Sequence, residues 1–309
     1  MNFTIAETEN NTRLDKYLVG ALPELSRNQI QKLIEENLVM VNEVGQKSNY
    51  RLKTADIVTI VSTSRAEKVA KEYDHSIFEL ITIVAETSDY VIINKPAGLI
   101  IHGSDFLLEP SLVDWLLKRY PEIINIGDDK QRPGIVHRID KDVSGMVVIA
   151  KTPEAFKHFK KLFAYRRIKK IYTALVFDKV IREKDTIEFV IERSTSGHKM
   201  AARPVNQEGK PSISEFEIIT RYINYTLLKI QIKTGRTHQI RAHLAAYGHP
   251  IVGDNLYGTH RNKLANQKLK TDRIYLVASE LSFKDLQGEP QSYKINLPEK
   301  FNELLKVIK

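Results

Sequence analysis

Residues 134–150 read GIVHRIDKDVSGMVVIA, in which a polar loop leads directly into an apolar run that is typical of a buried β-strand. His137, Arg138 and Asp140 stand close together in this loop. Loops that are held by a rigid sheet often present reactive side chains, so the three residues are candidates for a catalytic cluster. An aspartate in a loop also caps turns, and the segment alone leaves both roles open.

A second polar cluster follows the strand-like segment 225–232. Residues 234–244 read TGRTHQIRAHL, with two arginines and two histidines within eight residues from Arg236. Because backbone N–H groups at a helix start attract anions, this transition from loop to helix is a candidate anion site. His238 and His243 are five residues apart, whereas histidines that bind a metal from one helix face are four apart. We therefore expect no metal site here.

The region between the two clusters is strongly basic. Residues 157–170 read KHFKKLFAYRRIKK, with seven cations, three aromatic residues and no acidic residue. Thr152 and Pro153 predict the start of a helix, and its aromatic side chains are expected in the core. The cations have the spacing of a face that contacts phosphates. The candidates are Lys160, Lys161, Arg166, Arg167 and Lys169.

The composition agrees with a polyanionic partner. Among 309 residues, 47 are Lys or Arg and 38 are Asp or Glu, which gives a formal net charge of +9. A merely soluble basic protein has the same average, but clustering at 157–170 favours nucleic acid. The absence of cysteine excludes disulfide-linked partners and thiolate chemistry. Without a signal-like start or an apolar run of about 18 residues, we expect a soluble cytoplasmic protein with no membrane partner.

Residues 1–62 are interpreted as a separate unit of two helices and β structure. An apolar pattern at helical spacing begins at Leu14 and ends at Pro23. Ser26 and Gln29 have the spacing of a capping box, which predicts the second helix. Short strands are expected at 38–41 and 57–61. Several polar side chains of this unit can share one helix surface, or they form only a solvated face. They are Arg13, Lys16, Arg27, Gln31 and Lys32.

The remaining chain is interpreted as a linker and one larger domain. Residues 63–76 are polar and rich in charge, and residues 77–309 alternate short β-like runs with helical stretches. This alternation predicts the α+β class with a mixed or mainly antiparallel sheet.

The first unit resembles the S-four RNA-binding domain, first known from a ribosomal protein. The resemblance is carried by RLDKYL at 13–18, SRNQI at 26–30 and VMVN at 39–42. Glu43 stands where the family usually has glycine, so we expect a different hairpin turn. The resemblance implies RNA contacts by Arg13, Lys16, Arg27 and Lys32.

Most of residues 85–285 resemble the RluA-type family of RNA pseudouridine synthases. Four motifs in order carry this resemblance: INKPAGL at 93–99, HRID at 137–140, KIYTALV at 170–176, and TGRTHQIR at 234–241 continuing to Tyr257-Gly258. The resemblance implies an isomerase that needs no cofactor. Such an enzyme breaks the bond between ribose and N1 of uracil in structured RNA and rejoins the sugar at C5.

The resemblance also implies roles for individual residues. Asp140 is expected to be the catalytic aspartate, Tyr172 to pack on the target uracil, and Arg236 to be the basic partner of Asp140. The carboxylate either attacks the ribose covalently or removes a proton from its 2′ carbon. Arg138 is expected to fill the space of the flipped nucleotide, and His137 to contact RNA beside it.

These expectations define the partner and the alternatives. The RNA is expected to be ribosomal, from the large subunit, with transfer RNA as the other candidate, and the protein to be a monomer without metal. The alternative is a non-catalytic RNA-binding or ribosome-assembly protein, although a pure binder has no need of a carboxylate facing an anionic ligand. A metal-dependent nuclease is disfavoured because no compact set of carboxylates has metal-binding spacing.

Overall fold

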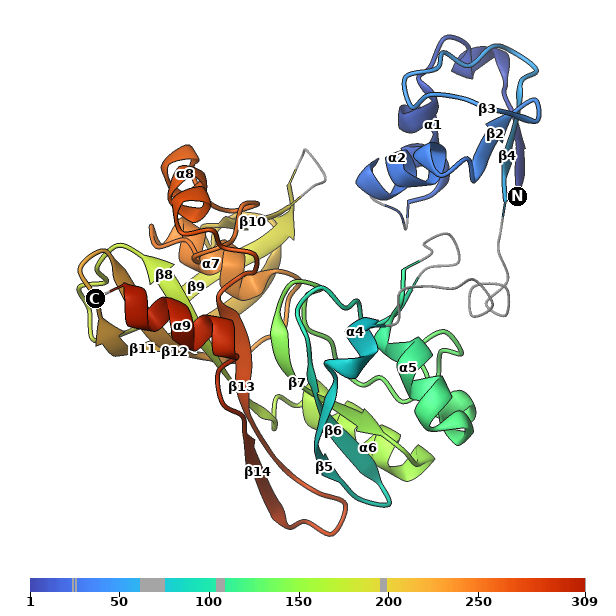
Figure 1. The fold of residues 1–309 in the computed structure, drawn as a ribbon. Helices are drawn as coiled ribbons and strands as arrows, with labels where there is room; N and C mark the ends of the chain where they lie inside the picture. Colours follow the sequence, from blue (N-terminus) through green and yellow to red (C-terminus); the bar gives the residue numbers. More distant parts are fainter. Residues whose placement is uncertain (24, 26, 62–75, 104–108, 195–198, 309) are drawn as a thin grey trace. The chain divides into compact units, whose positions relative to one another are not determined.

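The protein forms two compact units (Figure 1). The computed structural model describes all residues except 24, 26, 62–75, 104–108, 195–198 and 309. The smaller unit consists mainly of Met1–Tyr73, and the larger one of Asp74–His102, Ser111–Arg193 and Lys199–Lys309. The predicted linker, 63–76, lies outside the described residues except for Ser76, so the domain boundaries stay predictions. Within the described part of the chain, no helix has the length and apolarity needed to cross a bilayer.

The smaller unit packs two helices against a four-stranded antiparallel sheet. Leu14, Leu18, Ile30 and Leu33 are fully buried between the helices and the sheet, as their helical spacing predicts. The strand order is β1-β4-β2-β3. The capping box at Ser26 lies outside the described residues. The elements are β1 (Asn2–Thr4), η1 (Glu7–Glu9), α1 (Leu14–Ala21), α2 (Arg27–Glu35), β2 (Val39–Val41), β3 (Val44–Gly45) and β4 (Ile57–Ile60).

The hairpin between β2 and β3 turns on two residues with left-handed backbone. Val41 pairs with Val44, and between them Asn42 has φ 51° and Glu43 has φ 67°. Two positive φ values in a two-residue loop define a type I′ turn, whose second position favours glycine. The chain therefore forms a tight two-residue hairpin in which Glu43 occupies a backbone region that is unfavourable for residues other than glycine.

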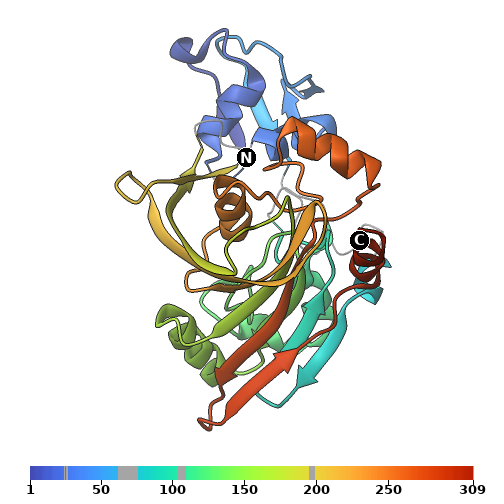
Figure 2. The same cartoon turned by 90° about the vertical axis from the view of Figure 1, so that its left-hand side faces the viewer.

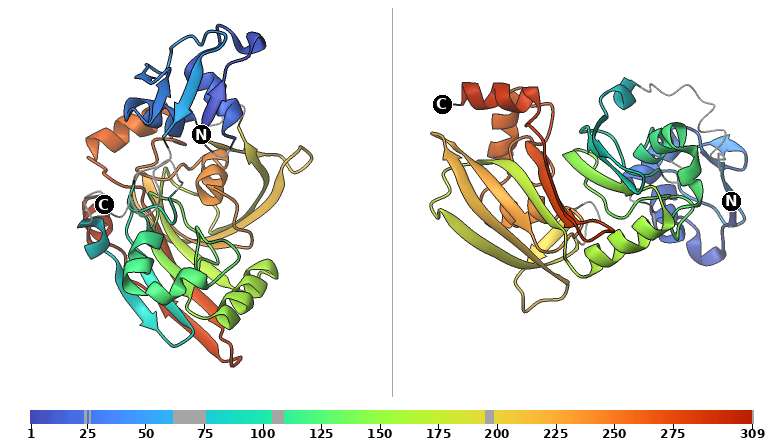
Figure 3. Two further views of the ribbon diagram at one scale, coloured as in Figure 1. Left: turned by 90° about the vertical axis from the view of Figure 1, so that its right-hand side faces the viewer. Right: turned by 90° about the horizontal axis from the view of Figure 1, so that it is seen from below.

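A strongly twisted ten-stranded sheet forms the larger unit in its described part (Figures 2 and 3). The strand order is β10-β9-β11-β12-β8-β13-β7-β6-β5, with β14 paired to β13. Neighbours are antiparallel except β13 and β7, which are parallel. The predicted α+β class with a mixed sheet is confirmed. The strands are β5 (Thr82–Glu86), β6 (Tyr90–Lys95), β7 (Ser144–Ala150), β8 (Lys169–Phe177), β9 (Lys184–Arg193), β10 (Met200–Arg203), β11 (Lys210–Arg221), β12 (Tyr225–Ile232), β13 (Leu276–Lys284) and β14 (Pro290–Lys294).

Helices cover both faces of this sheet. The helical elements are α4 (Ser76–Glu79), α5 (Leu112–Arg119), η2 (Pro121–Asn125), α6 (Pro153–Ala164), α7 (Gln239–Ala246), α8 (His260–Lys268) and α9 (Glu299–Val307). Strand β8 lies between β12 and β13, and its side chains alternate between two cores. Tyr172 and Ala174 enter the main core, which α5, α6 and α7 share, whereas Leu175 and Phe177 pack beneath α9. This alternation directs Tyr172 toward the loops described next.

Helix α6 begins as predicted. Thr152 is the N-cap, and its Oγ1 accepts a hydrogen bond from the N–H of Ala155 at 3.2 Å. Phe156 and Phe159 are buried, which confirms their place in the core. The expectation fails at the end of the segment, because the helix ends at Ala164 and Tyr165 is exposed.

Candidate active site

A lysine buried beneath the sheet end holds the loop that carries Asp140. Lys95, at the end of β6, is fully buried, and its Nζ donates hydrogen bonds to the carbonyl oxygens of Pro96, Leu99 and Lys141 at 2.7, 2.8 and 3.0 Å. Burial lowers the pKa of its ammonium group to about 7. The residue after Asp140 is therefore tied to the segment Pro96–Leu99, which fixes the loop's position.

The other end of the loop is fixed by close backbone packing. Gly145 has φ 127°, and a Cβ there would lie 2.5 Å from the backbone N and O of Ala278 in β13. Only glycine allows this approach. It brings the parallel pair β7 and β13 together, with Gly145 opposite Ala278, directly behind the Asp140 loop.

Asp140 faces a buried arginine from helix α7. Nη1 of Arg241 lies 3.4 Å from Oδ2 of Asp140, while its Nε and Nη2 bind Asp254 at 2.7 and 3.0 Å. The side chains of Arg241 and Asp254 are 5% and 1% exposed, and that of Asp140 is 19% exposed. The bidentate pair with Asp254 orients Arg241, which makes one long contact with Asp140.

The arginine that meets Asp140 is not the one predicted from the sequence. Arg236 lines the same pocket, but no described side chain accepts a hydrogen bond from it, and its buried Nε has no partner. Its backbone N–H donates to Oε1 of Gln239, which closes the turn before α7. Arg241 reaches Asp140 because it lies on a helix whose residues 239–244 are all buried.

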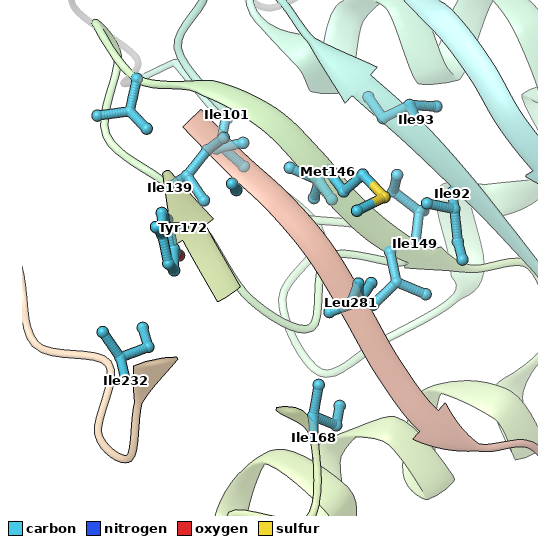
Figure 4. Packing of buried hydrophobic residues seen from close by; sticks show 14 of the residues in the cluster. Ile92, Ile93, Ile101, Ile139, Met146, Ile149, Ile168, Tyr172, Ile232 and Leu281 are labelled. Atoms are coloured by element: carbon cyan, nitrogen blue, oxygen red, sulfur yellow. The ribbon is translucent and has the colours of Figure 1, made fainter. Parts of the chain in front are cut away.

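Tyr172 forms an apolar wall of the same site. It is 7% exposed and belongs to the core cluster that Figure 4 shows with Ile139 and Ile232, both of which also line the pocket. Burial, reinforced by the negative charge of Asp140, raises the pKa of its hydroxyl above the usual range. The side chain therefore stays a neutral phenol that offers a flat ring with one polar tip.

These groups surround a pocket of about 450 Å³, a size typical of small-ligand sites. Its rim carries Arg138, Arg166, Lys170 and Arg236, and none of them lies within ion-pair distance of a described carboxylate. Burial lowers the pKa of Lys170 to about 8, and its Nζ lies 5.4 Å from the ring centroid of Phe163. The pocket thus combines one shielded carboxylate with a rim of unpaired cations, which suits an anionic ligand.

Comparisons with known proteins agree with this arrangement. Residues 89–246, more than half of the chain, match the family described as RNA pseudouridylate synthase, and residues 12–58 match the S4 domain. The chain belongs to the RNA pseudouridylate synthase family. Members of this family are isomerases, so the predicted enzyme class is confirmed. The match to the S4 domain likewise confirms the resemblance of the N-terminal unit.

The similarity to individual relatives covers nearly the whole length of both chains. An uncharacterized RNA pseudouridine synthase of Aquifex aeolicus is 36% identical over 298 residues, which cover 94% of this chain and 92% of the relative. Ribosomal large subunit pseudouridine synthase D of Haemophilus influenzae is 32% identical, covering 96% and 91%. The structure of Human RNA Pseudouridylate Synthase Domain Containing 4 has a TM-score of 0.62 and 20% identity, covering 79% of this chain and 98% of that one, which supports the shared fold.

The two loop residues predicted to contact RNA differ in character. Arg138 is exposed and lines the pocket of the synthase. A residue that contacts RNA must be accessible in this way. His137 stacks on Phe163 at a centroid distance of 4.6 Å, and its Nε2 accepts a hydrogen bond from the N–H of Val148. Burial lowers its pKa to about 3. His137 is therefore an uncharged part of the pocket wall and supplies no cation for phosphate.

The other predicted cations lie in two places, around the end of α6 and in the S4 unit. Lys161, Arg166, Arg167 and Lys169 are exposed around the end of α6, whereas Lys160 forms an ion pair with Asp128. In the S4 unit, Arg13 and Arg27 both bind the buried carboxylate of Asp15. Asp15 lies in α1 and Arg27 in α2, so the Arg27 pair links the two helices. Burial acts to raise the pKa of Asp15, but the hydrogen bonds and charges of the two arginines outweigh it and lower the pKa to about 2. Lys16 is exposed, and the side chain of Lys32 lies outside the described residues.

Four functional candidates lie in the recognised motifs but received no role from the sequence. They are Lys95, Lys170, Arg241 and Asp254. Arg241 was detectable in principle, because an arginine within a helix of otherwise buried residues requires an acidic partner. Lys95 ends an apolar strand, where a buried ammonium group also needs hydrogen-bond acceptors, and here three carbonyl oxygens supply them.

Proposed function

We propose that this synthase converts uridine to pseudouridine in large-subunit ribosomal RNA, with Asp140 as the carboxylate that acts on the ribose. The observation that carries the proposal is the convergence of Asp140 and Tyr172 in one pocket with a cationic rim. The RNA class is supported by relatives from Haemophilus influenzae and Yersinia pestis, both named Ribosomal large subunit pseudouridine synthase D and both 32% identical. We further propose that the enzyme acts in the cytoplasm as a monomer.

The reaction conserves all atoms of the nucleotide. The bond from C1′ to N1 breaks, the uracil turns, a bond from C1′ to C5 forms, and the proton on C5 leaves while N1 gains one. Asp140 suits either attack on C1′ or removal of the proton from C2′. Arg241 contacts only Oδ2 among the described contacts, which leaves Oδ1 of Asp140 for the sugar.

The detached uracil needs a surface that retains it without reacting with it. Tyr172 offers the flat face of a ring that remains protonated, so it acts through stacking. The neighbouring side chains of Ile139 and Ile232 extend this apolar wall. Turning of the base within the pocket is compatible with stacking because stacking fixes the ring plane and leaves rotation within that plane free.

Entry of the uridine requires base flipping, which costs roughly a few kcal/mol of stacking and pairing. Arg138 is exposed and lines the pocket, which supports the proposal that it fills the vacated position in the RNA. Arg236 has a buried Nε without an acceptor, and we assign its guanidinium to the bound nucleotide rather than to Asp140. The exposed cations at the end of α6 supply phosphate contacts.

The test is pseudouridine formation by an Asp140→Ala variant on unmodified large-subunit ribosomal RNA and on transfer RNA. We expect no product, with RNA affinity within a small factor of the unaltered enzyme because Asp140 contributes little to phosphate binding. Asp142→Asn changes an exposed carboxylate of the same loop and is the matched control, which should stay active. Product from Asp140→Ala would refute its assignment, and product in transfer RNA alone would refute the choice of RNA.

A further inference from the structure

The turn between α6 and β8 exposes a tyrosine beside the pocket. Tyr165 is 71% exposed, in contrast to Phe156 and Phe159 of the preceding helix, which are buried. Its chain neighbours Ala164 and Arg166 both line the pocket. A large aromatic ring placed in water at the edge of a binding site is a common feature of surfaces that bind single-stranded nucleic acid.

The backbone holds this tyrosine in a defined position. The N–H of Arg166 donates to the carbonyl of Phe163 at 3.2 Å, and that of Arg167 donates to the carbonyl of Leu162 at 2.8 Å. This pair of bonds, with Arg166 at φ 56°, is a Schellman motif that ends α6. Because these bonds define the backbone at Tyr165, the backbone of the turn loses little conformational entropy when a base binds to the ring.

The same motif carries a residue that is unfavourable for the backbone. The left-handed position of a Schellman motif is usually glycine, and a residue with a Cβ costs about 1–2 kcal/mol there. Arg166 occupies this position and lines the pocket. The exposed guanidinium group of Arg166 is therefore a further cation that a ligand at the pocket can meet.

The surroundings of Tyr165 select the chemistry of that ligand. The guanidinium carbon of Arg167 lies 5.8 Å from the centroid of the Tyr165 ring. Lys161, Arg166 and Lys169 are also exposed near it in sequence, and among the described residues none of these cations has an acidic partner. An exposed ring among unpaired cations matches a nucleotide, which presents an aromatic base and an anionic phosphate together.

We propose that Tyr165 and Arg167 form a stacking platform for an unpaired RNA base adjacent to the uridine that enters the pocket. This inference rests on the proposed function, since it assumes that the pocket receives a nucleotide from RNA. The platform has no sequence preference of its own, because every base offers a flat face. Its effect is to hold the strand next to the flipped uridine and thereby raise RNA affinity.

The first test measures binding by fluorescence anisotropy with two labelled probes. One is a single-stranded oligoadenylate, and the other is an abasic ribose-phosphate oligomer of the same length. For Tyr165→Ala we expect oligoadenylate affinity to fall by about fivefold or more, which corresponds to the lower end of measured base stacking. Tyr165→Phe keeps the ring and should bind like the unaltered enzyme, and neither variant should change affinity for the abasic oligomer.

A control and a kinetic measurement complete the test. Ile181→Ala truncates an apolar side chain that is 88% exposed, and it should leave oligoadenylate affinity unchanged. On unmodified large-subunit ribosomal RNA, Tyr165→Ala should raise KM with little change in kcat. Unchanged oligoadenylate affinity in Tyr165→Ala, or an equal loss with the abasic oligomer, would overturn the platform. If the ribosomal RNA is not modified at all but the ring-dependent binding persists, the proposed function fails and the platform stands.

Discussion

Replacement of Asp254 by asparagine tests how the catalytic carboxylate is positioned. The Asp254 carboxylate binds Nε and Nη2 of Arg241 at 2.7 and 3.0 Å, and its Oδ1 also accepts the N–H groups of Leu256 and Tyr257. Asparagine preserves the size and one oxygen but removes the charge. It also turns an NH₂ group toward a guanidinium that only donates hydrogen bonds. Arg241 is then buried without its bidentate partner.

The expected loss of stability follows from this burial. Removal of one partner from a buried ion pair costs about 3–5 kcal/mol, because the other charge stays uncompensated. For a unit of this size, each kcal/mol lowers Tm by about 2–4 °C, so the variant should melt about 6–20 °C lower. Activity should fall further than stability predicts. The released Arg241 is free to engage Asp140 fully and to occupy the oxygen that the ribose needs.

The assay is thermal unfolding of the full chain together with pseudouridine formation well below the lowered Tm. Asp178→Asn is the matched control, since Asp178 pairs with Arg261 at 3.1 Å on the surface, where both side chains are exposed. Such exposed pairs contribute little, so this variant should melt and act like the unaltered enzyme. If Asp254→Asn has an unchanged Tm and an unchanged rate, Arg241 is not oriented by Asp254, and the geometric argument is refuted.

Two further predictions concern the pocket rim and the S4 hairpin. Lys170 has a pKa of about 8, so it is charged below that pH, and RNA affinity should decrease as pH rises through 8. Lys170→Met should remove this pH dependence, whereas Lys161→Met, at an exposed site, should keep it, and identical pH profiles for Lys170→Met and the unaltered enzyme would contradict the assignment. Glu43→Gly should stabilise the N-terminal unit by about 1 kcal/mol in denaturant unfolding, since it relieves a left-handed φ of 67°; a loss of stability would show that the Glu43 side chain makes a compensating contact.

Local patterns in the sequence predicted much of the fold. The apolar run ending at Ala150 is the buried strand β7, and the pair Thr152-Pro153 begins α6. These features depend on residues that are neighbours along the chain, so alternation, helical spacing and capping chemistry reveal them. Tyr172 lies on β8, and the alternation that turns its ring to the pocket becomes evident only when both cores are known.

The contacts that define the site could not be read from such patterns. Arg241 and Asp140 are 101 residues apart, and their contact depends on the rotation of α7 against the loop. Both Arg236 and Arg241 have suitable chemistry, and only the packing distinguishes them. His137 is similar, because stacking on Phe163 and a bond from Val148 turn a candidate cation into an uncharged wall. Tyr165 is exposed, although the aromatic side chains of this segment were expected in the core, because α6 ends at the preceding residue, Ala164.

The contacts that hold the Asp140 loop determine whether the protein or the RNA must change shape when the two bind. Lys95 anchors one side of the loop through three carbonyl oxygens, and Gly145 presses the other side against β13. A loop built in this way has little freedom to adapt to its substrate, so the deformation falls on the nucleic acid. Uridines in bulges and loops, which are already partly unstacked, are cheaper to extract than those within a regular helix. From the rigidity of this loop we therefore expect the enzyme to prefer uridines at easily deformed sites in RNA.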